Sequence, residues 1–410
     1  MYNLHLSAEQ LEIRDTVRDF VVREIRPVVL KADRLDAGDR RLPIELVTKA
    51  SHIGLRTLAL SEASGGAGAD TLTCCIVTEE LAAGDPDVAA VLSQTATLAP
   101  VLFEQLMTHG QRERLFPAFL ADDRYHLAFA DDEPGNDTAL GVNYHQPAAT
   151  AAAPKTTAVR EGDTWVVNGV KSCVGNAPIA GLFAVQVQTA RSGVSTMLVP
   201  AETPGLTINE RDPKTRRHHG CCGELILNNV RVPAENLLGA EGQSPISARV
   251  AGPRVPQLAA LNLGIGRPAY DAALDYAKLR VQGGRRIIEH QAIGTKLAEI
   301  AIRLEVARAI IWQAAWAADH PGARADHSLS ELPLATIAQV FTAEAIYAAT
   351  KEAAECFGAM GVMRDMPLQK YVHDALLCLH SGAGTGDARL HIAEALADYR
   401  RAATPMLAAE

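Results

Sequence analysis

The pattern of apolar residues changes twice along this chain, and that change limits the folds that it can adopt. In the middle of the chain, short runs rich in β-branched residues are bounded by Gly, Pro or Asn, as is typical of strands. Before and after them, apolar residues recur at helical spacing. We therefore expect a helical domain at 1–124, a β domain at 125–238 and a second helical domain at 239–410. The strand-like runs are TWVVNG (164–169), LFAVQVQ (182–188), TMLVP (196–200) and ELILNNVRVP (224–233).

The two helical parts carry boundary and packing signals of their own. Ser7 and Gln10 have the spacing of a capping box, which predicts that a helix begins there. Pro27 is expected to bend or end that helix. Near the other end of the chain, apolar residues alternate steps of four and three from Ile293 to Ile311, the packing stripe of a long helix. Further helical runs at 257–282, 331–356 and 387–399 complete the pattern of a four-helix bundle.

Charge and hydropathy exclude several classes of function. The 410 residues carry a formal net charge of −9, and a nucleic-acid-binding protein would need a basic face. We find no run of about 18 apolar residues, so no membrane-spanning helix is expected. The first residues, MYNLHLSAEQ, lack the pattern of a secretory signal. These observations predict a cytoplasmic protein with no nucleic-acid partner.

Cysteines and glycines give few local signals of chemistry. Cys74 and Cys75 are adjacent within a helical stretch, where we expect them to be buried as small apolar residues. The segment HHGCCGE (218–224) is too crowded for one tetrahedral zinc site, so no metal is expected. The glycine runs GGAG (65–68) and SGAGTGD (381–387) could bind an anion through backbone N–H groups, but neither has the spacing of a Rossmann or P-loop motif.

Several sequence motifs, which we call sequence words, lie along the chain in a definite order and spacing. The first is the opening helix LSAEQLEIRDTVRDFVVREIRP (6–27). The later words are DEPGND (132–137), GDTWVVNGVKSCVGNA (162–177), NNVRVPAENLLGAEGQ (228–243), LDYAKLRVQGGRRIIEHQAI (274–293) and ECFGAMGVMRDMPLQKYVHDA (355–375). Together, over about residues 5–402, these words resemble those of the acyl-CoA dehydrogenase family.

The resemblance implies a fold, a cofactor and a reaction. The fold is α+β: an N-terminal helical domain, a β-barrel-like middle domain and a C-terminal four-helix bundle. FAD is held between domains and across a subunit interface, usually in a tetramer. The ligand is an acyl-CoA thioester, and the electron acceptor is an electron-transfer flavoprotein or a similar protein. In the family reaction, α,β-desaturation, a carboxylate removes the α-proton while a hydride moves to the flavin.

Five residues of the last domain stand at positions that bind the cofactor in the family. Arg280 matches an arginine that contacts the FAD phosphates across the interface, and Gln291 matches a glutamine near the cofactor. Phe357 and Gly358 lie in the segment that approaches the neighbouring subunit's FAD, and Glu355 replaces the usual glutamine there. Gly283 also departs from the family, which has phenylalanine at this position.

The middle domain departs further from the family pattern. Asp132 stands where threonine usually bonds the flavin pyrimidine ring, Cys173 where tryptophan or tyrosine covers the ring, and Gly175 where threonine or serine reaches flavin N5. An ionised Asp132 would disfavour the anionic reduced flavin and lower its reduction potential.

Neither of the family's two positions for the catalytic glutamate holds a carboxylate. The first falls on Gly382 or Ala383, and the second on Arg254 or Pro253. A backbone N–H at Gly382 or Ala383 could still bind the thioester oxygen, and Arg254 could contact an anionic ligand. Substitute bases near the first position are His380, Ser381 and Asp387, although His380 and Asp387 are more simply read as helix-end residues.

Four functions remain open from the sequence. The chain could be a dehydrogenase-like flavoenzyme with a non-standard base, or the base-lacking partner in a heterotetramer with a related dehydrogenase chain. It could also be a flavin monooxygenase of the same fold, or an acyl-CoA-binding protein without catalysis. The first alternative predicts a yellow protein whose flavin bleaches anaerobically with some acyl-CoA.

Overall fold

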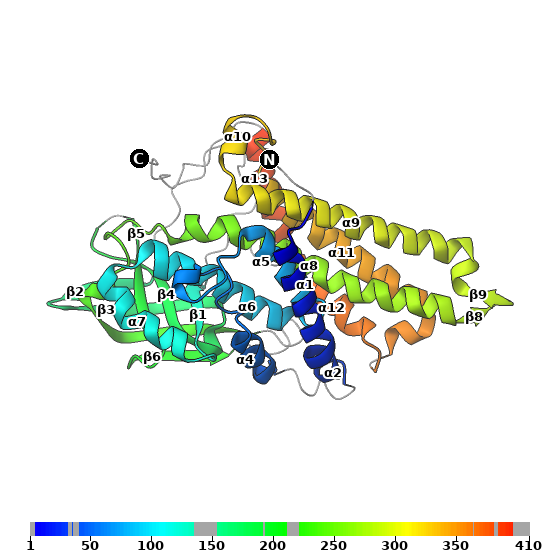
Figure 1. Ribbon diagram of the computed structural model, residues 1–410. Coiled ribbons are helices and arrows are strands. Elements are labelled where there is room, and N and C mark those ends of the chain that lie inside the picture. Colours follow the sequence, from blue (N-terminus) through cyan, green and yellow to red (C-terminus); the bar gives the residue numbers. More distant parts are fainter. Residues whose placement is uncertain are drawn as a thin grey trace.

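A computed structural model of the chain describes residues 5–31, 35, 41–134, 154–191, 193–210, 221–363, 365–380 and 384–396. The N-terminal and C-terminal parts of the chain are helical, and the part of the sequence between them forms one sheet, which lies at the left of Figure 1. The first helices are α1 (Ala8–Phe20), α2 (Arg26–Val29), α4 (Ile44–His52), α5 (Thr71–Ala82), α6 (Pro86–Ala99) and α7 (His109–Ala121).

The first helix begins as the sequence predicts but does not end at its proline. Ser7 accepts a hydrogen bond from the Gln10 backbone and the Gln10 side chain returns one, which confirms the capping box. After Phe20 the helix passes through a π-helical turn, Val21–Ile25, and continues as α2. The prediction that Pro27 bends or ends the helix is therefore wrong about the ending. The missing N–H of Pro27 falls directly after the π-helical turn, where the regular hydrogen-bond ladder is already interrupted, and the helix ends two residues later, at Val29.

The middle strands form one curled sheet. Its order is β1-β4-β2-β3-β7-β6, and β5 pairs with β4. The four strand-like runs of the sequence lie in β3, β4, β5 and β7. The strands are β1 (His126–Ala130), β2 (Thr157–Glu161), β3 (Thr164–Gly175), β4 (Ala180–Gln188), β5 (Val194–Pro200), β6 (Leu206–Glu210) and β7 (Cys222–Pro233).

The last part of the chain is helical apart from one short hairpin, β8 (Val281–Gln282) with β9 (Arg285–Arg286). The stripe from Ile293 to Ile311 faces the core, because its members are buried except for the partly buried Ile293. Helices α8, α9, α11 and α12 form the bundle (Figure 1). The prediction that the run at 387–399 supplies a bundle helix is wrong, because α12 packs on both α8 and α11, whereas α13, which covers 387–396 of that run, packs on α11. The helices are α8 (Ile246–Leu279), α9 (Gln291–Asp319), α10 (Gly322–Ala325), α11 (Leu334–Cys356), α12 (Leu368–Cys378) and α13 (Gly384–Leu396).

The first and last helical parts share one core. Cys74 and Cys75 are buried in it, as the sequence predicts, and burial raises the pKa of the Cys74 thiol to about 12. Helix α5 lies so close to α8 that a Cβ on Gly264 would come within 2.5 Å of the Ala82 side chain. This contact fixes α8 against the first helices and thereby sets the position of both cavities described below.

One helical run passes a simple length and hydropathy test for a membrane span. It covers Pro86–Leu106, and 78% of its most apolar window is buried inside the structure. Such burial is typical of the core helix of a soluble protein, and here the run packs between the bundle and the sheet.

Candidate functional site

Two cavities contain most of the residues that the sequence singles out. The first, which we call the interdomain cavity, has a volume of about 240 Å³ and lies where α6 and α8 meet the sheet. It brings together Asp132, Cys173, Gly175 and Arg254. These residues come from just after β1, from β3 and from α8, so the fold brings three separate segments of the sequence together.

Asp132 is fixed at the cavity by its neighbour Glu133. Glu133 is buried, forms a 2.8 Å ion pair with the buried Lys171, and accepts hydrogen bonds from the backbone N–H groups of Lys155 and Thr156. Burial opposes ionisation of Glu133, but the hydrogen bonds from Lys171 and Thr156 outweigh it and lower its pKa to about 2. The residues lie in the words DEPGND and VNGVKS, but no sequence signal showed that they pair.

The carboxyl group of Asp132 is held closer to its neutral form than an ordinary aspartate. Burial and the adjacent charge of Asp131 raise the pKa of Asp132, and the charges of Arg254 and Lys171 act in the opposite direction. Arg254 lies across the cavity on α8 and is exposed. Position 254, where the sequence comparison with the family places a catalytic base, therefore carries a cation that faces the carboxyl groups of Asp131 and Asp132. Pro253, the other residue expected there, lines an adjoining cavity of about 260 Å³.

Cys173 and Gly175 occupy an irregular end of β3. The pairing of β3 with β7 shifts between Lys171 and Val174, and Cys173 has a φ of +55°. A non-glycine residue rarely adopts this conformation outside turns and bulges. The next residue, Asn176, donates its side-chain amide to the carbonyl oxygens of Val91 and Leu127, which ties the end of β3 to α6. The bulge thus aims residues 173 and 175 into the cavity.

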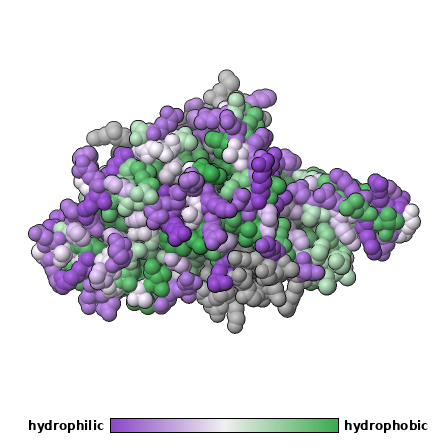
Figure 2. All heavy atoms as spheres, turned by 60° about the horizontal axis from the view of Figure 1, so that its bottom comes forward, coloured by the Kyte–Doolittle hydropathy of each residue, from purple (hydrophilic) through white to green (hydrophobic). Residues whose placement is uncertain are grey.

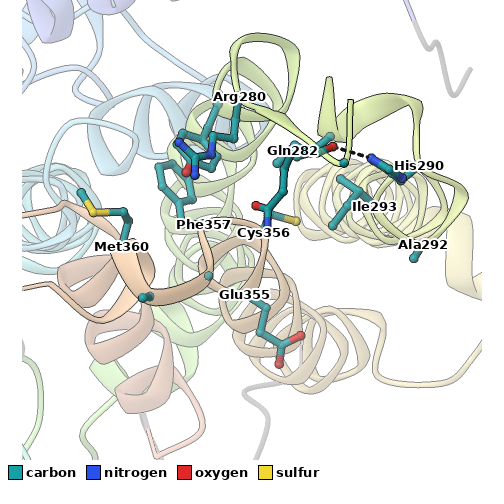
Figure 3. Close-up of a pocket in the computed structure, with 14 residues that line it drawn as sticks. Arg280, Gln282, His290, Ala292, Ile293, Glu355, Cys356, Phe357 and Met360 are labelled. Atoms are coloured by element: carbon teal, nitrogen blue, oxygen red, sulfur yellow. Dashed lines mark hydrogen bonds between the residues drawn. The ribbon is translucent and has the colours of Figure 1, made fainter. Parts of the chain in front are cut away.

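The second cavity, the bundle cavity, has a volume of about 630 Å³ and lies at the far end of α8. Arg280 caps α8, and Phe357 caps α11. Figure 3 shows these two side chains next to each other. The Phe357 ring stacks on Tyr276 with their centroids 4.3 Å apart. Gly358 follows with a φ of +56°, and a Cβ there would meet nothing within 4 Å.

Two predicted cofactor residues of this region have different surroundings. Glu355 lines the bundle cavity, but its carboxylate forms an ion pair with Lys296 and points away from Arg280 in Figure 3. Gln291 begins α9 at an exposed position between the lining residues His290 and Ala292, and it is not itself a lining residue. The bundle cavity therefore contains Arg280, Glu355, Phe357 and Gly358, with Gln291 at its edge.

The β8–β9 hairpin explains one departure from the family. Gly283 and Gly284 form its two-residue turn with φ values of +64° and +82°. Positive φ at both central residues is the requirement of a type I′ turn. The Gln282 carbonyl can only accept, so His290 donates to it from Nε2 over 3.0 Å (Figure 3). At Nδ1, His290 then accepts a hydrogen bond from Arg285. Phenylalanine at 283 would strain this turn.

The expected loop position of the base lies outside the described residues. Gly382 and Ala383 are the two residues of that position. The substitute base Ser381 and the histidines His218 and His219 also lie outside the described residues. His380 ends the described stretch after α12, and Asp387 lies buried in the first turn of α13.

Most of the chain matches models of one protein family. Family models described as the N-terminal, middle and C-terminal domains of acyl-CoA dehydrogenase match residues 7–123, 145–230 and 252–397. The chain is 31% identical over 370 residues to the mitochondrial short-chain specific acyl-CoA dehydrogenase of Bos taurus, covering 88% of this chain and 84% of that protein.

Solved structures show the same fold. Butyryl-CoA dehydrogenase from Megasphaera elsdenii superposes with a TM-score of 0.80 at 26% identity, covering 95% of this chain and 98% of that one. A glutaryl-CoA dehydrogenase from Mycobacterium smegmatis, in complex with FADH2, superposes with a TM-score of 0.77 at 24% identity, covering 95% of each chain.

Proposed function

Because this chain belongs to the acyl-CoA dehydrogenase family, whose members are oxidoreductases acting on the CH–CH group of acyl-CoA, we propose that it is an FAD flavoprotein acting on an acyl-CoA thioester. The proposed reaction is α,β-desaturation, or a variant of it with a non-standard base. One observation carries this proposal: Asp132, Cys173, Gly175 and Arg254, from three separate segments of the sequence, line one cavity between the sheet and α8.

The bundle cavity fits the phosphate and adenine parts of FAD. The Arg280 guanidinium offers a fixed charge and several N–H donors to phosphate oxygens. The stacked Phe357–Tyr276 pair supplies a flat apolar wall, and the open space above Gly358 permits close approach to the backbone. In the interdomain cavity, Asp132 and Cys173 would face the flavin ring, which supplies hydride acceptance when FAD is bound.

The separation of the two cavities supports an FAD site that is shared between chains. Arg254 and Arg280 lie near opposite ends of α8, and a helical rise of about 1.5 Å per residue separates them by roughly 39 Å. A single dinucleotide does not span that length. We therefore propose that one chain supplies the interdomain cavity and a second chain supplies the bundle cavity, in a homotetramer or a heterotetramer.

Exposed apolar side chains support such an assembly. Leu279 and Val362 near the bundle cavity are 80% and 71% exposed, and Val281, Met360 and Met363 are exposed beside them. Figure 2 shows green, apolar surface among the purple of the arm that this end of the bundle forms at the right. Association would bury this surface.

A specific observation favours a second candidate function. The α-proton needs a base, and the cavity presents the Arg254 cation at one of the two expected positions. Arg254 and backbone donors can stabilise an anionic ligand but cannot remove a proton. The chain would then be the base-lacking partner of a related dehydrogenase chain. In either role an electron-transfer flavoprotein, or a similar protein, would accept the electrons. The cytoplasmic location stays a prediction from the sequence.

The visible spectrum of the purified protein tests these functions. A yellow protein that bleaches anaerobically with an acyl-CoA supports the flavoenzyme, and bleaching only after co-expression with a related dehydrogenase chain supports the partner subunit. Oxygen consumption with external reduced flavin would instead indicate a monooxygenase. A colourless protein that binds CoA esters in both preparations would overturn the proposed function and indicate a non-catalytic binding protein.

A further inference from the structure

Gln94 of α6 occupies the space that a side chain at position 175 would need. A Cβ built on Gly175 would lie 2.4 Å from Gln94 Oε1 and 3.3 Å from Gln94 Cδ. Side chains do not approach each other this closely, so a larger residue at 175 would displace the Gln94 carboxamide. Both residues line the interdomain cavity. Gly175 and Gln94 therefore depend on each other: the side chain that fills this part of the cavity comes from α6 and not from β3.

The orientation of the Gln94 carboxamide follows from its hydrogen bond. Its Nε2 lies 2.9 Å from the carbonyl oxygen of Gly175. A carbonyl oxygen can only accept, so the amide nitrogen must be on that side and Oε1 on the other. No hydrogen bond from the described residues reaches Oε1. The group left available beside position 175 is thus an acceptor.

The arrangement is held rigidly. Asn176, next to Gly175, bonds the backbone of α6 at Val91, which precedes Gln94 by less than one turn of the same helix. The strand end and the helix therefore move together, and Oε1 keeps a fixed position in the cavity. A fixed acceptor selects ligands with an N–H or O–H donor at that point.

We propose that Gln94 is a positioning residue for the flavin ring, and that its Oε1 favours the reduced ring over the oxidised ring. This inference rests on the proposed function. When a hydride adds to the isoalloxazine, both of its electrons enter the ring and its hydrogen becomes an N–H at N5, so an acceptor atom of the ring becomes a donor. An acceptor held beside N5, the atom that the family's residue at position 175 reaches, gains a hydrogen bond only in the reduced state. Gln94 would thus oppose the effect of the nearby Asp132 charge.

The test compares flavin midpoint potentials, measured with a reference dye, in the purified holoprotein and three variants. Gln94→Leu removes the acceptor, and we expect a lower midpoint potential that corresponds to about three- to tenfold weaker relative binding of reduced FAD. Gly175→Thr alone should displace the carboxamide and reduce the FAD content. Combining Gln94→Ala with Gly175→Thr should restore FAD content and move the potential back upward. Gln186→Leu removes a carboxamide that bonds Ser247 outside both cavities, and serves as the matched control.

Separate outcomes test the two proposals. If the unaltered chain binds no flavin in any preparation, the proposed function fails, and this inference fails with it. If the chain is yellow but Gln94→Leu keeps the spectrum and the midpoint potential of the parent, only the role of Gln94 is overturned. A merely structural role would lower the melting temperature of Gln94→Leu without shifting the potential, and the double variant would then give no recovery.

Discussion

The ammonium group of Lys370 lies 3.1 Å from the carboxylate of Asp85, and both side chains are almost completely buried. Lys370 also contacts Asp374 one turn further along α12, at 2.7 Å. Asp85 is the N-cap of α6, where it accepts hydrogen bonds from the backbone of Asp87 and Val88. One buried cation therefore connects the last helices to the helix that carries Gln94. Burial opposes the charge of Lys370, but Asp374 and Asp85 outweigh it and raise the pKa of this lysine.

Removing this cation should destabilise the protein strongly. Lys370→Met removes the cation that lies between two buried carboxylates, and we expect a loss of about 3–5 kcal/mol in the free energy of unfolding. Urea unfolding followed by circular dichroism measures it. Lys351→Met, which removes an exposed lysine from α11, is the control and should stay within about 0.5 kcal/mol of the parent. Equal losses in the two variants would contradict the role of the buried contact.

Arg254→Glu should add a base to the interdomain cavity. If a missing carboxylate limits proton removal, the variant should bleach bound flavin with an acyl-CoA about 10²–10⁴-fold faster than the parent chain. Stopped-flow absorbance under anaerobic conditions measures the rate. Arg249→Glu makes the same charge change on α8 but lines the adjoining cavity, and it should give no gain. A parent chain that already bleaches as fast as Arg254→Glu would show that another group serves as the base.

The reduction potential of bound flavin should depend on the ionisation of Asp132. Burial and Asp131 raise the pKa of Asp132 above its ordinary value. As the pH rises through that pKa, the new negative charge disfavours anionic reduced flavin, so the potential should fall more steeply than in Asp132→Asn. Midpoint potentials across a pH series measure the difference. Asp163→Asn, in an exposed turn of the sheet, should follow the parent curve.

Arg280→Gln should weaken FAD binding. Hydrogen bonds from a charged donor contribute about 1.5–3 kcal/mol, so the dissociation constant should rise about ten- to hundredfold. Titration of apoprotein with FAD, followed by fluorescence, measures it. Arg286→Gln changes an exposed arginine on β9 that does not line the bundle cavity, and little change is expected. Comparable losses in the two variants would indicate a general charge effect.

His126 should make the fold sensitive to mild acid. It is fully buried, and burial followed by the charge of Arg56 lowers its pKa to about 4. Between pH 6.5 and 4 the unfolded chain takes up a proton that the folded chain does not, so stability falls as the pH falls. This contribution is on the order of 3 kcal/mol. His126→Gln should flatten the pH dependence of unfolding, whereas the exposed His109→Gln should not.

The long helices and four of the strands could be predicted because their patterns are local. Strand β1 was not identified: all five of its residues are buried, so it shows no alternation. Strand β2 was missed for the opposite reason, since four of its five residues are exposed. Periodicity reports which face of an element is buried, and neither strand has one buried and one exposed face.

The residues of the candidate site were predicted only at positions that could be aligned with the family. Asp132, Cys173, Gly175 and Arg254 were singled out by position, and the structure brings them together. Gln94 carries no such signal, because it lies in an apolar helix and meets Gly175 only through the packing of α6 on the sheet. The ion pair of Glu133 with Lys171 was missed although both residues lie in aligned segments, because no local pattern shows which side chains of two segments pair in the fold.

The length of α8 has a genetic consequence. In the proposed assembly, each chain carries two unlike half-sites at opposite ends of α8, and each complete site would draw its halves from different chains. A chain damaged at Arg280 and a chain damaged at Asp132 would therefore each be defective alone. Mixed oligomers of the two would contain some sites built from the two intact halves, so the defects would complement each other in trans.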